Sequence, residues 1–531
     1  MIQLFIHITA MNGVLTHRNV MSTSAVAIVL RPHIIFALFG GYLMDYIEKF
    51  EPKHVLEHFK NICDIPHISN HEQALRNYIK DFAQKNGHEY YEDEAGNLIV
   101  YVNATQGYET VPSFLMQAHM DMVAAKEAAS NHNFLTDSIK THLVDGHYLY
   151  ADGTTLGADN AVGMMNMLAL MEDKSVVHPP LEMLFTVCEE AGMVGIRKVD
   201  YSRIKSRRMI NMDCGDPDVM CVSTAGAANC LLRLPLKKKA ISGVIFEISI
   251  DGLLGGHAGL MIDAGRISAV TVMGRILCQM SKCIPLNIVY TSCDRVCGIV
   301  PAMKALITID EKNVFAAEKA FEKIAETICR EYADPEEGLH ITLKKSYEKV
   351  YPEMLDEETT ENLQRMLYMM PFGVTKRDWR EKETILCSNN TMAVAFKENC
   401  IEMETMLRAP EDTVKEELFT RIGIIADWCG AEIILLDSFS GWPYRRDSQL
   451  QKLCCDAFAE LTGEQLKMEK HNSCAETGIV AGAIPDMDIV AIAPLGRDAH
   501  TPTEHLDLDT VKPFWDFLCL LLKKMCTEVN N

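Results

Sequence analysis

The stretch Ser113-Phe-Leu-Met-Gln-Ala-His-Met-Asp121 is an apolar run of strand length that ends in a histidine and a carboxylate. Four further apolar runs of strand length occur along the chain, at residues 97–102, 181–187, 208–212 and 487–493. Helical patterns, such as the one at residues 160–171, separate the runs. Apolar strands that alternate with helices predict an α/β fold, in which a mostly parallel sheet is covered on both faces.

The middle of the chain has a different pattern. Half-alternating strands at residues 243–250 and 303–309 are each followed by a long helical pattern, which favours an α+β domain. We therefore predict one α/β domain in two parts, residues 44–227 and 437–531, interrupted by an inserted α+β domain at residues 228–436. Residues 1–43 are either an added surface segment or precede a translation start at Met44, and we favour the second interpretation.

Composition excludes some classes of partner. The chain has 531 residues, 48% of them hydrophobic, and a formal net charge of -22. Such an acidic chain lacks the Lys/Arg density that phosphate contacts need, so we predict no nucleic-acid partner. Arg31 and His33 interrupt the apolar segment 26–43, which disfavours a membrane anchor. The 18 cysteines include no C-x-x-C pair, which indicates a reducing compartment, the cytoplasm.

Ligand-type side chains follow the predicted strands, where open α/β sheets bind ligands. In the first run His119 and Asp121 point to the same face of the strand, and a metal-binding imidazole usually donates its other N–H to a carboxylate. A glycine-rich turn brings Asp159 to the start of a helix. Each signal is weak by itself, because H-x-D is often accidental and Asp is a common helix N-cap.

Three more segments have the same character. Glu189 and Glu190 end a strand as adjacent carboxylates, whose repulsion is costly unless a cation or a shared proton relieves it. Asp213 ends another strand, and His500 lies in a loop after the last one. Alone, each could be a solvated surface group. Together, two histidines and three carboxylates at strand-to-loop junctions match the mixed N/O ligation of zinc-class ions.

The combination favours two-metal hydrolysis, in which one carboxylate bridges ions about 3.5–4 Å apart. The adjacent carboxylates could then divide their roles, one binding metal and the other acting as general base. Motifs of competing chemistries, namely H-E-x-x-H, G-x-S-x-G, the P-loop and G-x-G-x-x-G, are not found in the sequence.

From about Met44 to the last helix, the sequence resembles the aminoacyl-histidine dipeptidases, carnosinase-like members of the di-zinc aminoacylase and carboxypeptidase superfamily. Six segments in the family's order carry the resemblance: Ile65-Pro-His-Ile-Ser69, Gln117-Ala-His-Met-Asp-Met-Val123, Gly153-Thr-Thr-Leu-Gly-Ala-Asp-Asn160, Glu189-Glu-Ala-Gly-Met193, Gly255-Gly-His-Ala-Gly259 and His500-Thr-Pro-Thr-Glu504. It implies a peptidase catalytic domain whose inserted domain is a lid.

The resemblance also implies a role for each site residue. Asp159 would bridge two ions, with a cis peptide to Asn160, and Glu189 would be the general base. Asp121 would orient His119. The remaining roles are metal ligation by His119, Glu190, Asp213 and His500, and substrate binding from the lid by His257, as an electrophile, and by Arg408, on the substrate carboxylate. We expect two divalent ions, zinc first, with cobalt or manganese as alternatives.

Three segments depart from the family's pattern. The family commonly has Asn-Ala-Ile-Pro where this chain has Gly298-Ile-Val-Pro301, and His-Ala-Gly-Leu-Glu-Cys-Gly where it has the longer segment 471–478. The family's Arg-Ser-Ser is Arg408-Ala-Pro410. The metal positions are all kept, so the sequence predicts the reaction more firmly than the substrate.

We therefore predict hydrolysis of dipeptides with a free N-terminus, including Xaa-His, by a metal-activated water. A related tripeptidase or N-acyl amino acid hydrolase is the first alternative, and a catalytically silent binding protein is the second. The expected binding partner is a small peptide substrate. The sequence does not decide between a monomer and a homodimer. It also leaves open whether His257 acts within its own chain.

Overall fold

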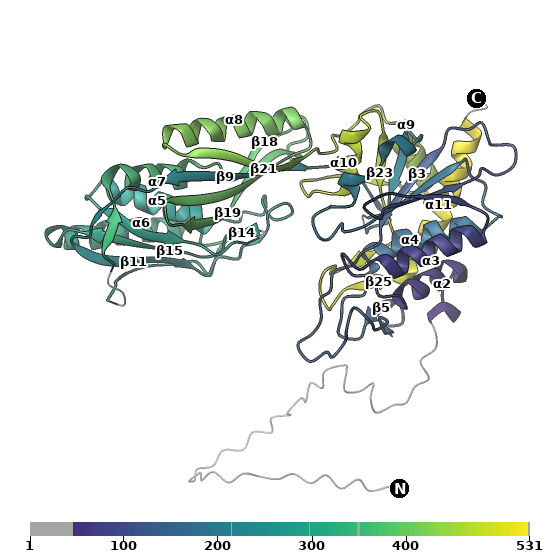
Figure 1. The fold of residues 1–531 in the computed structure, drawn as a ribbon, viewed down its shortest axis with the longest axis horizontal. Coiled ribbons are helices and arrows are strands. Elements are labelled where there is room, and N and C mark those ends of the chain that lie inside the picture. The colour runs from purple at the N-terminus through teal and green to yellow at the C-terminus, as the bar shows by residue number, and fades with distance from the viewer. Residues whose placement is uncertain (1–45, 214, 297, 348–350, 529–531) are drawn as a thin grey trace, which may run out of the picture. The chain divides into compact units, whose positions relative to one another are not determined.

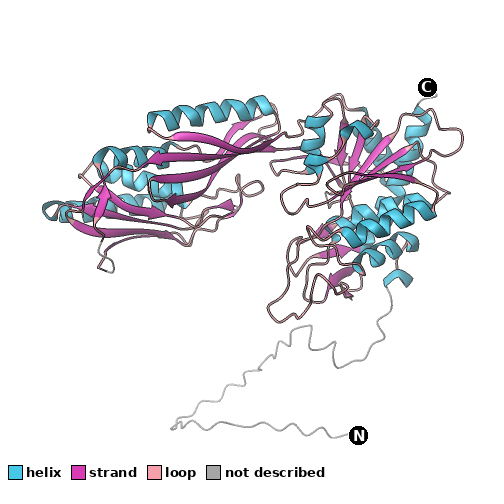
Figure 2. Cartoon of the chain, in the orientation of Figure 1, coloured by secondary structure: helices cyan, strands magenta, loops and turns pink. Residues whose placement is uncertain are grey.

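The computed structural model describes residues 46–213, 215–296, 298–347 and 351–528. The predicted extension, residues 1–43, lies outside the described residues. A mixed central sheet is built from the first and last parts of the sequence, and antiparallel sheets are built from the middle part (Figure 1). Figure 2 distinguishes the helices from these strands by colour.

The central sheet has the strand order β1-β2-β6-β3-β7-β23-β8-β22. Four neighbouring pairs are parallel: β6–β3, β3–β7, β7–β23 and β8–β22. The pairs β1–β2, β2–β6 and β23–β8 are antiparallel. The bounds are β1 (Glu89–Glu92), β2 (Leu98–Val102), β6 (Leu181–Thr186), β3 (Phe114–His119), β7 (Arg208–Asn211), β23 (Asp488–Ala491), β8 (Val219–Thr224) and β22 (Lys467–His471).

Both faces of this sheet are covered, which is why its central strands are apolar at nearly every position. In β3, Phe114 and Met116 join a core with residues of α2, α3, α4, α9 and α11, whereas Leu115 joins a second core with residues of α10. The helix bounds are α2 (Lys53–Cys63), α3 (Gln73–Lys85), α4 (Ala158–Glu172), α9 (Gln449–Thr462), α10 (Glu476–Ala483) and α11 (Val511–Glu528).

A small antiparallel sheet belongs to the same part of the protein. Its order is β24-β25-β5-β4, formed by β24 (Gly496–Arg497), β25 (His505–Asp507), β5 (Tyr148–Ala151) and β4 (Thr141–Val144). The loop between β24 and β25 carries His500, and Leu149 and Leu506 from this sheet are buried in the main core. The position of His500 is therefore tied to the packing of the central domain.

The middle part of the sequence forms two larger antiparallel sheets around a core of its own. One has the order β18-β19-β20-β9-β21, formed by β18 (Gly373–Arg377), β19 (Ile385–Phe396), β20 (Cys400–Ala409), β9 (Gly226–Pro235) and β21 (Glu432–Phe439). The other has the order β13-β15-β11-β16, formed by β13 (Asn287–Ser292), β15 (Met303–Ile309), β11 (Val244–Asp251) and β16 (His340–Lys345). Their core includes residues of α5 (Ala269–Ser281), α6 (Val314–Glu331), α7 (Glu357–Met369) and α8 (Asp412–Trp428).

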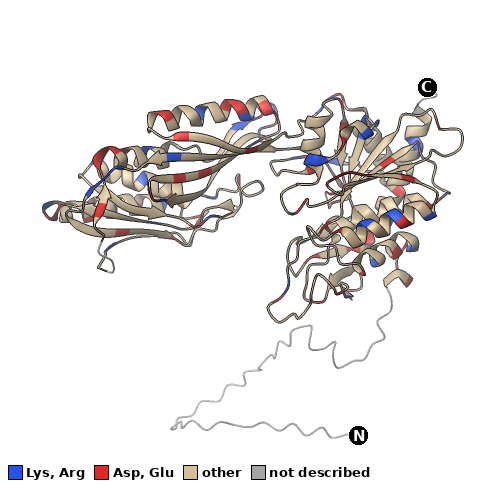
Figure 3. Ribbon diagram, viewed as in Figure 1, with Lys and Arg blue, Asp and Glu red and all other residues tan. Residues whose placement is uncertain are grey.

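The predicted α/β class with an inserted α+β domain is confirmed by this architecture. The boundaries at residues 227/228 and 436/437 stay predictions. Acidic and basic residues are interspersed along the helices (Figure 3). Among the described residues, no helix is both long and apolar enough to cross a bilayer.

Candidate metal centre and active site

Five predicted ligands come together at the carboxyl edge of the central sheet. His119 is the last residue of β3, Glu190 follows β6 and Asp213 follows β7. Because β6, β3 and β7 are parallel neighbours, their carboxyl ends lie side by side at one edge. Asp159 reaches this edge from the start of α4, and His500 reaches it from the β24–β25 loop.

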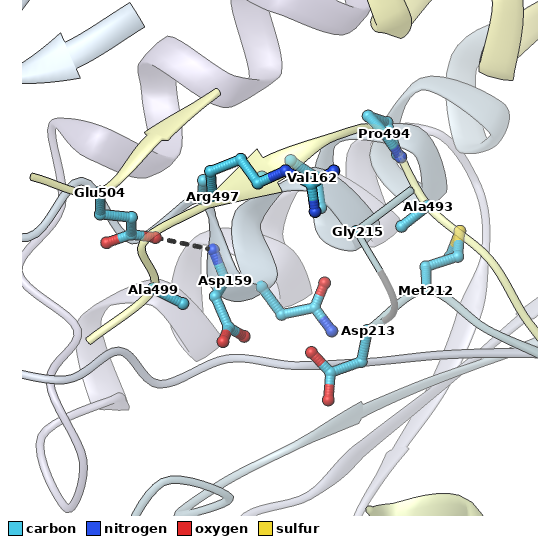
Figure 4. A pocket seen from close by; sticks show the side chains of 13 residues that line it. Asp159, Val162, Met212, Asp213, Gly215, Ala493, Pro494, Arg497, Ala499 and Glu504 are labelled. Carbon is cyan, nitrogen blue, oxygen red and sulfur yellow. Dashed lines mark hydrogen bonds between the residues drawn. The ribbon is translucent and has the colours of Figure 1, made fainter. Parts of the chain in front are cut away.

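The first group consists of His119, Asp159 and Asp213, whose ligand atoms all lie within 4.8 Å of one another. The imidazole Nε2 of His119 is 2.8 Å from Oδ1 of Asp159 and 3.6 Å from Oδ1 of Asp213. Figure 4 shows the Asp159 and Asp213 carboxylates in a pocket of about 90 Å³. The His119 side chain is only 1% exposed, so its ring is fixed by packing.

The second group consists of Asp159, Glu190 and His500. Nε2 of His500 is 2.8 Å from Oε1 of Glu190 and 3.3 Å from Oδ2 of Asp159. Asp159 therefore belongs to both groups and offers a different oxygen to each. The peptide bond from Asp159 to Asn160 is cis, as the family resemblance implied.

The charges of this cluster are only partly balanced by its own residues. Burial would lower the pKa of His119, but the Asp121, Asp159 and Asp213 carboxylates raise it well above its usual value. Hydrogen bonds to Asp159 and Glu190 raise the pKa of His500 to about 10. Protons on the two histidines thus compensate the carboxylates, and divalent cations could take over this compensation.

The carboxylates respond differently to the same environment. Burial would raise the pKa of Asp159, but His119 and His500 together hold it well below its usual value. Burial and the charge of Asp159 raise the pKa of Asp213 to about 7. An acid with a raised pKa beside a strongly ionised one is typical of a site that is built to hold positive charge. The imidazole and carboxylate donors present fit zinc-class ions.

Glu189 lies beside the ligands, and its carboxylate forms a third cluster with His119 and Glu190. Burial raises the pKa of Glu189 well above its usual value. A raised pKa makes this carboxylate a stronger base toward a proton of water. Glu189 therefore has the environment that a general base needs, and this role stays a prediction.

Asp121 supports the cluster in a way that the sequence did not fully predict. His119 Nδ1 is 2.9 Å from the backbone oxygen of Asp121 and 3.6 Å from its carboxylate. The Asp121 carboxylate instead accepts hydrogen bonds from the Ser69 hydroxyl at 2.7 Å and from the backbone N–H groups of Glu189 and Glu190 at 2.9 and 3.1 Å. Asp121 thus fixes the Glu189–Glu190 segment as well as contacting His119.

The two predicted substrate residues lie in the middle part of the chain. His257 ends the short strand β12 (Gly256–His257), which pairs with β14 (Gly298–Ile299), and its Nδ1 accepts the backbone N–H groups of Gly259 and Leu260 at 3.3 and 3.1 Å. Partial desolvation lowers the pKa of His257, and the charges of Arg408 and His500 add to this effect. The neutral imidazole therefore carries its proton on Nε2, which can donate.

The loop that contains His257 contacts the segment after β22. A Cβ atom at Gly259 would lie 2.9 Å from Cε1 of His257 and 3.1 Å from the backbone oxygen of Asn472, so a larger residue at this position would displace its neighbours. Asn472 Nδ2 donates to the backbone oxygen of Gly259 at 3.3 Å. The structure thus brings His257 next to the central domain of its own chain.

Comparisons with known proteins agree with this geometry. Residues 115–524 match the model of peptidase family M20/M25/M40. The chain belongs to this peptidase family. It is 28% identical to the cytosol non-specific dipeptidase of Escherichia coli strain K12, over 91% of this chain and 99% of that protein.

Solved structures agree with the M20 assignment. The aminoacylhistidine dipeptidase from Vibrio alginolyticus superposes with a TM-score of 0.83 and 27% identity, covering 90% of this M20 peptidase and 98% of that chain. A tripeptidase from Staphylococcus aureus has a TM-score of 0.54 and 14% identity, covering 90% and 99%, which shows the common fold alone. The predicted recognition and enzyme class are confirmed, and the substrate is considered below.

Glu504, for which the sequence predicts no role, holds the turn that carries Asp159. Oε2 of this buried carboxylate accepts the backbone N–H groups of Leu156 and Gly157 at 2.8 and 2.9 Å. Its Oε1 accepts the backbone N–H of Asp159 at 3.1 Å, the hydrogen bond drawn in Figure 4. Burial raises the pKa of Glu504 to about 7. The sequence signal for Glu504 is its place at the end of the family segment His500-Thr-Pro-Thr-Glu504, because contacts between distant segments leave no local pattern.

Glu476 is a second buried carboxylate for which the sequence predicts no role. It is fully buried at the start of α10, and it accepts hydrogen bonds from the Thr186 hydroxyl at 2.8 Å and from the Gln117 side-chain amide. The Gln117 side chain in turn accepts from Asn211 at 2.5 Å. This polar network joins the ends of β3, β6 and β7 beneath the ligands.

Proposed function

We propose that this M20 peptidase hydrolyses dipeptides with a free N-terminus, including Xaa-His dipeptides, with the help of two divalent metal ions. The observation that carries the proposal is Asp159, which faces His119 with one oxygen and His500 with the other. The relatives support the substrate class, because the proteins from E. coli and V. alginolyticus are named as dipeptidases.

Two ions would be held by His119, Asp159 and Asp213 on one side and by Asp159, Glu190 and His500 on the other. When bound, zinc-class ions supply a Lewis acid for the peptide carbonyl and ease the deprotonation of water. Zinc is the first choice for these ligands, with cobalt and manganese as alternatives.

The remaining steps are assigned to side chains of this chain. Glu189 accepts a proton from the attacking water as the new C–O bond forms, and it passes a proton to the leaving amine nitrogen as the C–N bond breaks. His257 donates its Nε2 proton in a hydrogen bond to the carbonyl oxygen as negative charge develops there. Arg408 binds the C-terminal carboxylate of the substrate.

The experiment is a substrate panel tested with chelated protein and with protein reloaded with zinc, cobalt or manganese. We expect metal-dependent release of amino acids from dipeptides, and little release from the same dipeptides with an acetylated N-terminus. If N-acyl amino acids or tripeptides are hydrolysed faster than every free dipeptide, the dipeptide assignment is wrong. A working di-metal site should hold two ions per chain. A content below about one ion per chain after reloading would therefore favour a catalytically silent binding protein.

A related tripeptidase or N-acyl amino acid hydrolase is the second candidate. It is favoured by the segments at residues 298–301 and 471–478, which differ from the dipeptidase pattern and lie next to His257 in the structure. The same panel separates these candidates, because they share the metal centre and differ only in the substrate ends that they accept.

Two further properties belong to this proposal. A cytoplasmic location is supported by the E. coli relative, which is named as a cytosol protein, and by the free thiols of the described cysteines. The contact between the His257 loop and Asn472 supports a His257 that acts within its own chain. That arrangement is compatible with a monomer and with a homodimer.

A further inference from the structure

Arg408 is a buried cation without an acidic partner. Its side chain is in β20, only 9% of the residue is exposed, and no carboxylate of the described residues forms an ion pair with it. Its buried Nε has no hydrogen-bond partner. Because burying an unpaired charge is costly, a cation in this position indicates that an anion completes the site.

The guanidinium contacts one side chain across the domains. Nη1 of Arg408 donates to Sγ of Cys474 at 2.9 Å. Burial raises the pKa of the Cys474 thiol, so the sulfur is neutral and leaves the charge of Arg408 uncompensated. A neutral thiol is a weak acceptor, which can orient a guanidinium without competing strongly with a carboxylate.

Cys474 belongs to a segment that contacts the inserted domain at several points. Asn472 Nδ2 donates to the backbone oxygen of Gly259 at 3.3 Å and to the Ser388 hydroxyl at 2.9 Å. Just before the inserted domain, the backbone N–H of Ala225 donates to the backbone oxygen of Ser473 at 2.9 Å. Cys474 lies between these contacts and the buried Glu476. The position of its sulfur is therefore fixed from both sides. It also lies in the segment whose length departs from the aminoacyl-histidine dipeptidase pattern.

We propose that Cys474 is a positioning residue that orients the Arg408 guanidinium for the C-terminal carboxylate of the substrate. The proposal rests on the proposed function for the identity of the substrate. It assigns a specificity role to a thiol that touches neither the peptide bond nor the metal ligands.

The kinetic test compares a dipeptide with its C-terminal amide in the metal-loaded enzyme. Cys474→Ala should raise KM for the dipeptide by about three- to tenfold, the range expected for one hydrogen bond, with kcat nearly unchanged and the amide unaffected. Cys474→Ser should restore most of the loss, because the hydroxyl keeps an acceptor. Arg408→Ala should abolish the preference for the free carboxylate, and Cys283→Ala, at an exposed thiol, should change nothing. Equal losses on the dipeptide and its amide, or no loss on either, would overturn the proposal.

A second measurement needs no turnover. Cys474 is partly exposed, so its alkylation by iodoacetamide can be followed by mass spectrometry of the peptide that contains it. A free amino acid should slow this labelling, whereas its amide should not, and Cys283 should label at the same rate in both. If the protein hydrolyses no dipeptide and the carboxylate still protects Cys474, the proposed function fails while the Cys474 assignment stands. Equal labelling with acid and amide contradicts the assignment itself.

Discussion

The candidate metal ligands and the two proposed substrate residues are held in different ways. His119, Glu190 and Asp213 lie at the ends of buried parallel strands. The Asp121 carboxylate accepts the backbone N–H of Glu190, and the Glu504 carboxylate accepts that of Asp159. His257 lies in an exposed two-residue strand, and Arg408 contacts a single thiol across the domains. The difference indicates a rigid metal centre and a second group that has to be brought to it. Substitutions in one region should therefore leave the properties of the other region unchanged.

The largest effect is expected for Glu189→Gln. Glutamine keeps the size of the side chain but cannot accept a proton, and proton transfer by a positioned group contributes typically about 10²–10⁴-fold to the rate. We expect kcat to fall by about 10³-fold, with two ions still bound per chain by elemental analysis. Activity close to that of the wild type would show that Glu189 is not the base. Lost metal would instead assign it to the ligands.

The next largest effect is expected for His257→Ala. Removal of one donor to a developing oxyanion costs about 10²–10³-fold in kcat, and His257 contacts no metal ligand directly. We expect that loss with the metal content unchanged, so the two regions would separate cleanly. If metal is lost and the residual activity follows the metal content, His257 is a ligand or a structural residue.

A mixture of the His257→Ala and Glu189→Gln proteins serves as the control for this prediction. Since the His257 loop contacts Asn472 of its own chain, each variant should remain inactive in the mixture. Recovered activity, in a sample with demonstrated subunit exchange, would mean that two chains share one site. The metal centre and the His257 that acts on it would then belong to different subunits.

How much of this could be predicted from the sequence depends on the region. The apolar strands, and the ligand types that follow them, give both the central sheet and its five candidate ligands, because strand ends are local features that the parallel arrangement brings together. Family resemblance was needed to single out His257 and Arg408. Glu504, Glu476 and Cys474 gained a role only from the structure, because each one contacts a segment far away in the sequence.

A smaller effect is expected for Glu504→Gln, which weakens the support of Asp159. The buried carboxylate accepts three backbone N–H groups, and an amide would turn a donor toward at least one of them. Groups that orient metal ligands typically contribute about 10–100-fold to metal affinity or activity. We expect weaker metal binding in a titration with a fluorescent chelator, with activity restored by excess metal. A normal metal affinity would mean that the turn before Asp159 keeps its conformation without the Glu504 carboxylate.

The smallest effect is expected for Glu336→Gln, the corresponding change in the inserted domain. Glu336 is 1% exposed and accepts the backbone N–H groups of Leu254 at 2.8 Å and Ile267 at 3.2 Å, at the two ends of the loop that carries His257. Loss of one hydrogen bond to a buried charge costs about 1.5–3 kcal/mol of stability, so the thermal midpoint should fall by a few degrees.

The kinetic signature of Glu336→Gln separates it from Glu504→Gln. A looser loop places His257 correctly for a smaller fraction of the time, so kcat should fall by about two- to fivefold while metal affinity stays normal. Excess metal should not restore the loss. If Glu336→Gln lowers metal affinity as Glu504→Gln does, the inserted domain contributes to the metal centre directly, and the metal centre and the loop that carries His257 form one cooperative unit.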